Sequence, residues 1–356
     1  MPLQLNRVLD PALAGFDDII DVRSPAEFAE DHLPGAINLP VLDNEEHARV
    51  GTIYKQVSPF DARKLGAALV AANAARHIAG PLADRDGAWR GLIYCWRGGQ
   101  RSGSFATILG QIGWRIDTIR GGYKSWRRLV VDKVQNGSLA APVVVLDGNT
   151  GSAKTAILTR LAARGAQVID LEGLAHHRGS LFGAMGDQPS QKAFEGRLAV
   201  AMEQIDPARP VILEAESSRI GNLNLPKAIW RAICDAPRIR LAVPVGVRAA
   251  YCTRDYADLT LDRDALQDKV QALAALHSRD RIAHWLELAR SGQMEELAAG
   301  LMRDHYDPRY ERHRARFATQ RESLLPVKDL TDLDSIAARV EAEALRLTGN
   351  LRQSRS

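Results

Sequence analysis

The sequence predicts an α/β protein of two domains, each built on a central parallel sheet. Three observations predict this fold. The chain has 356 residues, more than one typical domain, and its apolar content of 46% can supply two cores. Short apolar strands alternate with helical segments, as in parallel sheets covered on both faces. Glycine-rich loops follow two of the strands, at residues 95–104 and 148–155, where such sheets place ligands.

Composition and charge narrow the class of protein. The formal net charge of +4 is compatible with a polyanion partner without being evidence for one. The cysteines, Cys95, Cys234 and Cys252, lack the paired spacing of a metal site, which favours a reducing compartment. The N-terminus has no signal-peptide apolar region, and no apolar run approaches the ~20 residues of a membrane span. We therefore expect a soluble cytoplasmic protein without a membrane partner.

The first domain begins with a strand expected at residues 19–23, where an apolar run ends in charge. A helix follows, with Ser24 as its N-cap and Glu27 completing a capping box. Residues 32–40 contain a Pro-Gly pair near their start, which predicts a turn and then a second strand.

The next strand, at residues 92–94, leads into a loop that contains Cys95, Arg97, two glycines and Arg101. A helix is predicted at residues 105–112. A thiol at the end of a strand, facing a helix N-terminus and flanked by arginines, is favoured in its thiolate form. Cys95, Arg97 and Arg101 are therefore the candidate catalytic residues. The alternative, a buried structural thiol, is disfavoured because its neighbours are Arg and Gly rather than Leu and Val.

Several segments of the first domain resemble the rhodanese family. The resemblance covers most of residues 1–130 and rests on residues 21–23, 27–28, 32–38, the Cys95 loop and 121–126. It implies a cysteine that carries sulfur or selenium as a persulfide or its selenium analogue. Asp21 and Arg23 are expected to hold loops together, and His32 lies in a structural signature rather than in a catalytic position.

The spacing within the loop leaves two chemistries open. Five residues separate Cys95 from Arg101, one more than in the usual sulfurtransferase loop. The longer spacing is similar to that of a phosphatase family whose wider loop accommodates a phosphate-sized anion. Spacing alone therefore permits chalcogen transfer or phosphate ester cleavage.

The second domain opens with a strand at residues 143–146 and a P-loop that leads into a helix at Ala156. Lys154 and the loop amides would bind phosphates, and Thr155 could ligate a magnesium ion. Ala153 stands where the pattern expects Gly, so its Cβ would restrict close approach or a left-handed conformation. The alternative is a tight glycine turn that binds nothing. The candidate phosphate- or diphosphate-binding residues are Gly148, Thr150, Gly151, Ser152, Ala153, Lys154 and Thr155.

Two later segments bring further site candidates. A strand at residues 168–171 runs towards His176, His177 and Arg178, which we interpret as a polar loop lining an anion site. Zinc is disfavoured, because adjacent histidines usually point apart. The strand at residues 210–213 ends in acids, where P-loop proteins keep a metal-holding or water-orienting carboxylate. Either acid alone could instead cap a turn. The other site candidates are His177, Arg178, Glu214, Glu216 and Arg219.

The C-terminal part is predicted to be mainly helical, with amphipathic helices over residues 259–299. Residues 305–317 interleave arginines with Tyr, His and Phe, which suits RNA through phosphate contact and stacking. A solvated helix face is the alternative. The candidate tRNA contacts are Arg309, Arg312, Arg314 and Arg316. The expected division is 1–130, a linker at 131–141, a P-loop domain with C-terminal helices at 142–347, and a disordered tail at 348–356.

The pairing of the two domains resembles the bacterial tRNA 2-selenouridine synthase family over nearly the whole chain. Besides the two loops, the resemblance rests on residues 171–175, 177–180, 182–183, 214, 216–217 and 306–308. It implies a transferase that converts wobble 2-thiouridine in tRNA to 2-selenouridine through S-geranyl-2-thiouridine. The implied substrates are geranyl diphosphate and selenophosphate, the latter supplied by its synthase. No firmly bound cofactor is expected beyond a magnesium ion that accompanies the diphosphate.

Other readings remain open at this stage. One is a rhodanese-type sulfurtransferase coupled to a P-loop nucleotidase. Another is a rhodanese module that only binds partners, which Cys95 disfavours. A phosphatase would leave the P-loop domain unexplained.

Overall fold

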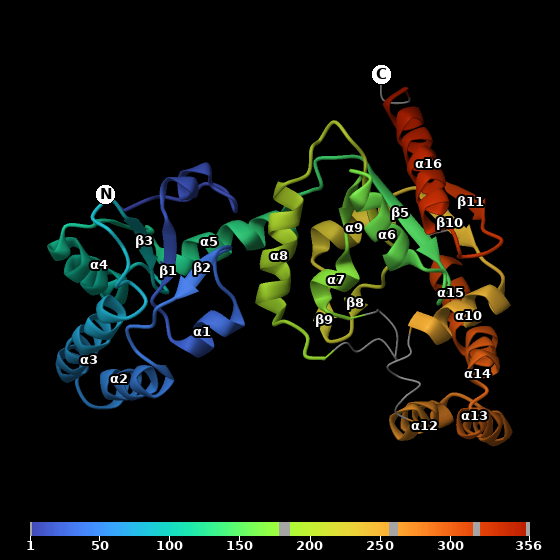
Figure 1. The fold of residues 1–356 in the computed structure, drawn as a ribbon, viewed down its shortest axis with the longest axis horizontal. Coiled ribbons are helices and arrows are strands. Elements are labelled where there is room, and N and C mark those ends of the chain that lie inside the picture. The colour runs from blue at the N-terminus through green and yellow to red at the C-terminus, as the bar shows by residue number, and fades with distance from the viewer. Residues whose placement is uncertain (1, 178–185, 256–262, 316–320, 354–356) are drawn as a thin grey trace. The chain divides into compact units, whose positions relative to one another are not determined.

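The computed structural model describes residues 2–177, 186–255, 263–315 and 321–353. The chain divides into two compact units (Figure 1). The first comprises residues 1–137 together with 189–203, and the second comprises 138–188 together with 204–356.

The first unit is built on a four-stranded parallel sheet in the order β2-β1-β3-β4. The central strands β1 and β3 are paired so that Asp21 lies beside Tyr94, and Cys95 follows directly at the carboxyl end. Apolar side chains from both strands, among them Ile20 and Ile93, are fully buried in the core of this unit. The strands are β1 (Asp18–Asp21), β2 (Ala36–Asn38), β3 (Arg90–Tyr94) and β4 (Arg115–Thr118).

Helices cover this sheet, and the first begins as predicted: Ser24 precedes α1, and its backbone N–H donates to Glu27. The helices of the unit are the 3-10 helix η1 (Pro11–Gly15), α1 (Pro25–Glu30), α2 (Asn44–Gln56), α3 (Pro59–Ala79), α4 (Gln100–Ile112), α5 (Gly122–Val131), the π-helix η2 (Asp132–Asn136) and α8 (Gln191–Glu203).

Helix α8 belongs to the first unit, although its residues lie within the range predicted for the second domain. It packs against α5, and Gly196 allows the close approach, because a Cβ there would meet the Trp126 ring at 3.1 Å. Ion pairs of Arg127 with Glu195 and of Lys133 with Glu203 strengthen the contact. Complementary burial and charge thus decide the partner of α8, not its place in the chain.

The second unit contains a five-stranded parallel sheet in the order β11-β10-β5-β7-β6, with the P-loop strand β5 at its centre. Both sheets are therefore parallel and helix-covered, which confirms the predicted α/β class. The strands are β5 (Val143–Gly148), β6 (Gln167–Ile169), β7 (Val211–Glu214), β10 (Arg238–Ala242) and β11 (Glu322–Pro326), with a separate antiparallel hairpin of β8 (Arg219–Ile220) and β9 (Leu223–Asn224).

The described residues of the C-terminal part are mainly helical, as predicted, apart from the edge strand β11; residues 259–262 of the predicted helical stretch lie outside the described residues. Helices α12, α13 and α14 share a small core of their own around Trp285, and α16 packs against α6 and the sheet (Figure 1). The helices are α6 (Lys154–Ala163), α7 (Leu171–Ala175), α9 (Lys227–Asp235), α10 (Val245–Asp255), α12 (Arg263–Gln271), η3 (Ala272–Ala275), α13 (Arg279–Ser291), α14 (Met294–Leu301), η4 (Met302–Tyr306), α15 (Asp307–Arg314) and α16 (Leu333–Gln353).

Helix α16 extends past the point where a disordered tail was expected. It runs to Gln353, and the side chain of Thr348 is buried and donates to the carbonyl of Ala344. Among the residues that the structure describes, no helix combines the length and apolar character of a membrane span.

Candidate active sites

The Cys95 thiol lies between β3 and the first turn of α4. Its Sγ accepts hydrogen bonds from the backbone N–H of Gly99 at 3.3 Å and from the Ser102 hydroxyl at 3.2 Å. The residue is only 4% exposed. Burial alone would raise its pKa, but the donors Ser102 and Gly99 and the charge of Arg101 outweigh it and hold the pKa of Cys95 below the ordinary value. The geometry thus favours the thiolate, the nucleophilic form.

The two candidate arginines are placed differently from one another. Arg101 forms a two-pronged ion pair with Glu27, at 2.6 and 3.2 Å, and acts on Cys95 through its charge. Arg97 is exposed on the loop. Ser102 was not among the predicted site residues, although its place in the first turn after the loop was a usable signal.

Residues 121–126 contact the backbone of the Cys95 loop and fix its position. Gly122 has a left-handed φ of 58°, and a Cβ there would collide with the carbonyl oxygen of Cys95. The next N–H, from Tyr123, donates to that same carbonyl at 2.9 Å. Glycine is therefore required at residue 122 so that this segment can fix the loop.

The structural roles expected for the N-terminal signature are present. The Arg23 guanidinium donates to both carboxylate oxygens of Asp21 and to the carbonyl of Asp31, so it connects the ends of two segments. The ring Nδ1 of His32 bonds the carbonyl of Phe28 at 2.9 Å, and the imidazole stacks on the Phe28 ring.

In the second unit, the P-loop joins β5 to α6 as predicted. Lys154 begins α6, and its ammonium donates to the carbonyl of Gly148 at 2.9 Å. Ala153 adopts the left-handed conformation, with φ of 57° and ψ of 28°, that its Cβ was expected to restrict. The surrounding loop therefore imposes a strained conformation on a non-glycine residue, and this costs about 1 kcal/mol. Gly151 is also left-handed, with φ of 81°, and the Ser152 hydroxyl is buried.

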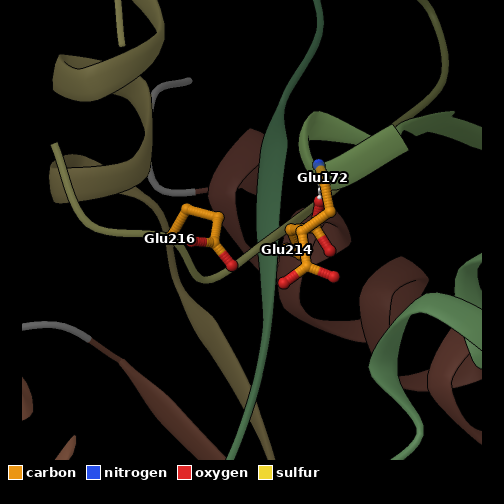
Figure 2. Close-up of side chains that lie close together, drawn as sticks. All are labelled: Glu172, Glu214 and Glu216. Carbon is orange, nitrogen blue, oxygen red and sulfur yellow. Dashed lines mark hydrogen bonds between the residues drawn. The ribbon is translucent and has the colours of Figure 1, made fainter. Parts of the chain in front are cut away.

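Three buried carboxylates lie close together in the second unit (Figure 2). Glu172, Glu214 and Glu216 point their carboxyl groups toward one another, with one oxygen atom of each within 4.8 Å of the others. Thr155 donates to Glu172 at 2.8 Å, so the residue predicted to ligate magnesium contacts this cluster. Both acids predicted as site residues, Glu214 and Glu216, belong to this cluster. Glu172, at the start of α7, was not predicted as a site residue, because it follows a different strand.

The cluster brings three acidic side chains together. Burial, then the charges of its acidic neighbours Glu172 and Glu216, raises the pKa of Glu214 well above its ordinary value. Its Oε1 accepts from the Glu172 N–H, whereas Oε2 is buried without a hydrogen-bond partner among the described residues. Burial would lower the pKa of Lys154, but Tyr310, Glu172 and Glu216 together raise it, so this lysine is charged.

Helix α15 brings a second set of side chains to the P-loop. Arg314 donates to both carboxylate oxygens of Asp147, each at 3.0 Å, and also to Asn149. Its guanidinium and the Lys154 ammonium lie 5.6 and 5.7 Å from the centre of the Tyr310 ring. Arg314, predicted as a tRNA contact, is therefore mostly buried in the phosphate loop, because the buried carboxylate of Asp147 requires a cation. Arg309 and Arg312 are exposed, and Arg316 lies outside the described residues.

The remaining predicted residues are less central. His177 follows the cluster, and its backbone N–H donates to the carbonyl of Glu172 at 3.0 Å. Burial lowers the pKa of His177, and the negative charge of Glu172 opposes this effect only in part. Arg219 is exposed in the β8–β9 hairpin and bonds the carbonyl of Gly221. Arg178 lies outside the described residues. His176, with φ of 51°, turns its ring to the carbonyl of Asp187.

Comparison with known proteins covers both units. Residues 6–129 match the model of the rhodanese-like domain, and residues 141–290 match the model of the tRNA 2-selenouridine synthase AAA domain. Three relatives carry the name tRNA 2-selenouridine synthase. Those from Aeromonas salmonicida (strain A449) and Alcanivorax borkumensis are 37% and 35% identical, over 74% and 82% of this chain and 72% and 88% of their own lengths. The relative from Chromohalobacter salexigens is 36% identical over 83% of this chain and 82% of its own.

Proposed function

The chain belongs to the tRNA 2-selenouridine synthase family, and on this premise we propose how its two units share the reaction. It is an enzyme that modifies tRNA by replacing the sulfur of a wobble uridine with selenium. We propose two steps. The P-loop unit transfers a geranyl group from geranyl diphosphate to the sulfur of 2-thiouridine, and the unit of Cys95 then replaces the S-geranyl group with selenium from selenophosphate.

In the first step, the sulfur of the base attacks the first carbon of the geranyl chain. The carbon–oxygen bond breaks, and its electron pair leaves with diphosphate. The leaving group must be held and its growing charge neutralised. Lys154 is charged and partly buried at the start of α6, where loop N–H groups and the helix dipole also favour an anion. These features support the assignment of this step to the P-loop.

A magnesium ion fits this site as the companion of the diphosphate. Thr155 and Glu172 are already joined by a hydrogen bond, and Glu214 and Glu216 lie within the same cluster. Oxygen ligands of this kind are those that magnesium prefers, and Oε2 of Glu214 is buried without a partner among the described residues. These four residues would hold the ion, which would neutralise phosphate charge.

In the second step, selenium forms a bond to C2 of the base, and the C2–S bond breaks. Its electron pair leaves with geranyl thiolate, and the phosphoryl group of selenophosphate goes to water as phosphate. The selenium of selenophosphate stays at the selenide level throughout: the Cys95 thiolate attacks phosphorus, the P–Se bond breaks, and its electron pair leaves with selenide, which then attacks C2. Water cleaves the resulting S–P bond and restores Cys95. The single observation that carries this assignment is the thiol of Cys95 held by Ser102 and Gly99, because these donors favour its nucleophilic form. The exposed Arg97 is available for selenophosphate oxygens.

The substrate partner is tRNA, and selenophosphate is supplied by the enzyme that makes it. Arg309 and Arg312 remain the proposed tRNA contacts, since both are exposed on α15.

Competition binding tests the proposed use of the P-loop. Geranyl diphosphate has an apolar tail and no base or ribose, and Ala153 departs from the P-loop pattern of nucleoside triphosphatases at the residue before Lys154. We expect geranyl diphosphate to bind full-length protein and to resist displacement by micromolar ATP or GTP. Displacement by ATP, or ATP hydrolysis stimulated by tRNA, would favour a sulfurtransferase coupled to a nucleotidase instead.

A further inference from the structure

An apolar pocket of about 330 Å³ lies between α2, α3 and α4 in the first unit. This volume is within the range of small-molecule sites. Most of its wall is aliphatic or aromatic, and its polar side is formed by α4 together with Arg63. The apolar wall includes Leu42, Val50, Tyr54, Ala62, Ala67 and Val70.

The pocket adjoins the start of α4. Gln100, Arg101 and Ser104, which line it, come from the beginning of this helix, which starts directly after the Cys95 loop. Leu42 and Val70, which also line it, belong to the same buried cluster as Cys95. A ligand in this pocket would therefore lie beside the reacting loop.

The lining indicates the chemical class of the ligand. An inorganic anion needs hydrogen-bond donors and gains nothing from aliphatic walls, so selenophosphate or thiosulfate does not account for this pocket. Arg63 is exposed and places positive charge at its edge, which suits an apolar chain attached to a polyanion; the charge of Arg101 is balanced by Glu27. Tyr54 is 56% exposed, so the wall continues to the protein surface, where such a chain could enter.

We propose that this pocket binds the prenyl chain of the S-prenylated tRNA base while selenium replaces sulfur beside Cys95. The inference rests on the proposed function, in which the group that leaves C2 is an alkyl thiolate with a long apolar chain. Burying that chain next to the loop orients C2 and stabilises the departing thiolate in place. The pocket thus selects the prenylated base over the unmodified 2-thiouridine for the second step.

Filling the pocket tests this role. Ala67→Trp places a large ring in the pocket from α3, and Ala68→Trp, its exposed neighbour outside the lining, is the matched control. Full-length protein, selenophosphate and RNA carrying S-geranyl- or S-methyl-2-thiouridine are mixed under single-turnover conditions. We expect Ala67→Trp to slow conversion of the geranyl RNA at least about tenfold and to leave the methyl RNA unchanged. Ala68→Trp should change neither rate.

Equal rates for Ala67→Trp and Ala68→Trp, or equal slowing of both RNAs by Ala67→Trp, would overturn the proposal. Tyr54→Ser, which removes part of the wall without adding bulk, should slow only the geranyl RNA, and it keeps the test decisive if Ala67→Trp unfolds. Calorimetry with the S-geranyl-2-thiouridine nucleoside separates the two claims. If wild-type protein binds the nucleoside but converts no geranyl RNA, and Ala67→Trp abolishes this binding, the pocket proposal is supported and the proposed function is contradicted. Equal binding by wild type and this variant would rule out the pocket.

Discussion

Arg248 and Asp307 form a two-pronged ion pair, with N···O distances of 3.0 and 2.7 Å, that anchors the P-loop backbone. The same guanidinium donates to the carbonyl of Thr150 at 3.0 Å, and the Arg248 side chain is almost fully buried. Helix α10 supplies the arginine and α15 the carboxylate, so two distant segments meet at the phosphate loop. We infer that this pair holds the loop in its binding conformation.

Arg248→Lys should weaken the binding of geranyl diphosphate about tenfold, because an ammonium cannot bond Asp307 and Thr150 with the same fork. Arg254→Lys, an exposed substitution on the same helix, is the control. Isothermal titration of full-length protein measures both. Equal affinities for the two variants would show that the ion pair does not position the loop.

Lys154→Ala should abolish geranyl transfer, since the leaving diphosphate loses the positive charge of the lysine. Conversion of RNA that already carries S-geranyl-2-thiouridine should persist, because Cys95 belongs to the other unit. Nucleoside mass spectrometry reports both activities, with Lys328→Ala as an exposed control. Normal geranyl transfer by Lys154→Ala would mean that the loop is structural.

Ser102→Ala should raise the pKa of Cys95, because the thiolate loses a hydrogen-bond donor and burial is left less opposed. The rate of Cys95 alkylation by iodoacetamide rises with the thiolate fraction, so this rate is measured as a function of pH. In wild-type protein the midpoint of the pH dependence should lie below that of an ordinary cysteine. The variant midpoint should shift upward by about one pH unit. Ser104→Ala is the control: Ser104 lies two residues further along α4, and this substitution should leave the midpoint unchanged. A downward shift, or none, would contradict the assigned role of Ser102.

Ala153→Gly should stabilise the protein by about 0.5–1 kcal/mol, because glycine adopts a φ of 57° without the Cβ strain. Ala162→Gly, at an exposed position within α6, should instead destabilise it by about 0.5–1 kcal/mol. Urea unfolding gives both values. A loss of stability in Ala153→Gly would show that the left-handed alanine is held by contacts that outweigh its strain.

The parts predicted from the sequence are those that short segments specify by themselves. The Cys95 loop and the P-loop each place their reactive residues within one strand–loop–helix segment, so their patterns were sufficient. Glu172 and Arg248 approach the P-loop from other segments, and no local pattern indicates such contacts. Arg314 was assigned to RNA because residues 305–317 interleave arginines with Tyr, His and Phe. The structure instead pairs Arg314 with the carboxylate of Asp147, which is only 2% exposed.

The same limit applies to α8. Its residues were assigned to the second domain by chain order, but the charges of Glu195 and Glu203 find their partners, Arg127 and Lys133, in the first unit. Amphipathic periodicity predicts that a helix buries one face and does not identify the surface that covers it.

Mass spectrometry of tRNA nucleosides made by Cys95→Ser tests the central claim, that geranyl and selenium transfer are separate steps in separate units. The serine hydroxyl is not ionised at neutral pH, so it cannot replace the Cys95 thiolate as the nucleophile that releases selenium from selenophosphate. Given tRNA, geranyl diphosphate and selenophosphate, the variant should therefore accumulate S-geranyl-2-thiouridine and make no 2-selenouridine. Normal 2-selenouridine from Cys95→Ser, or the absence of any geranylated nucleoside, would contradict the account.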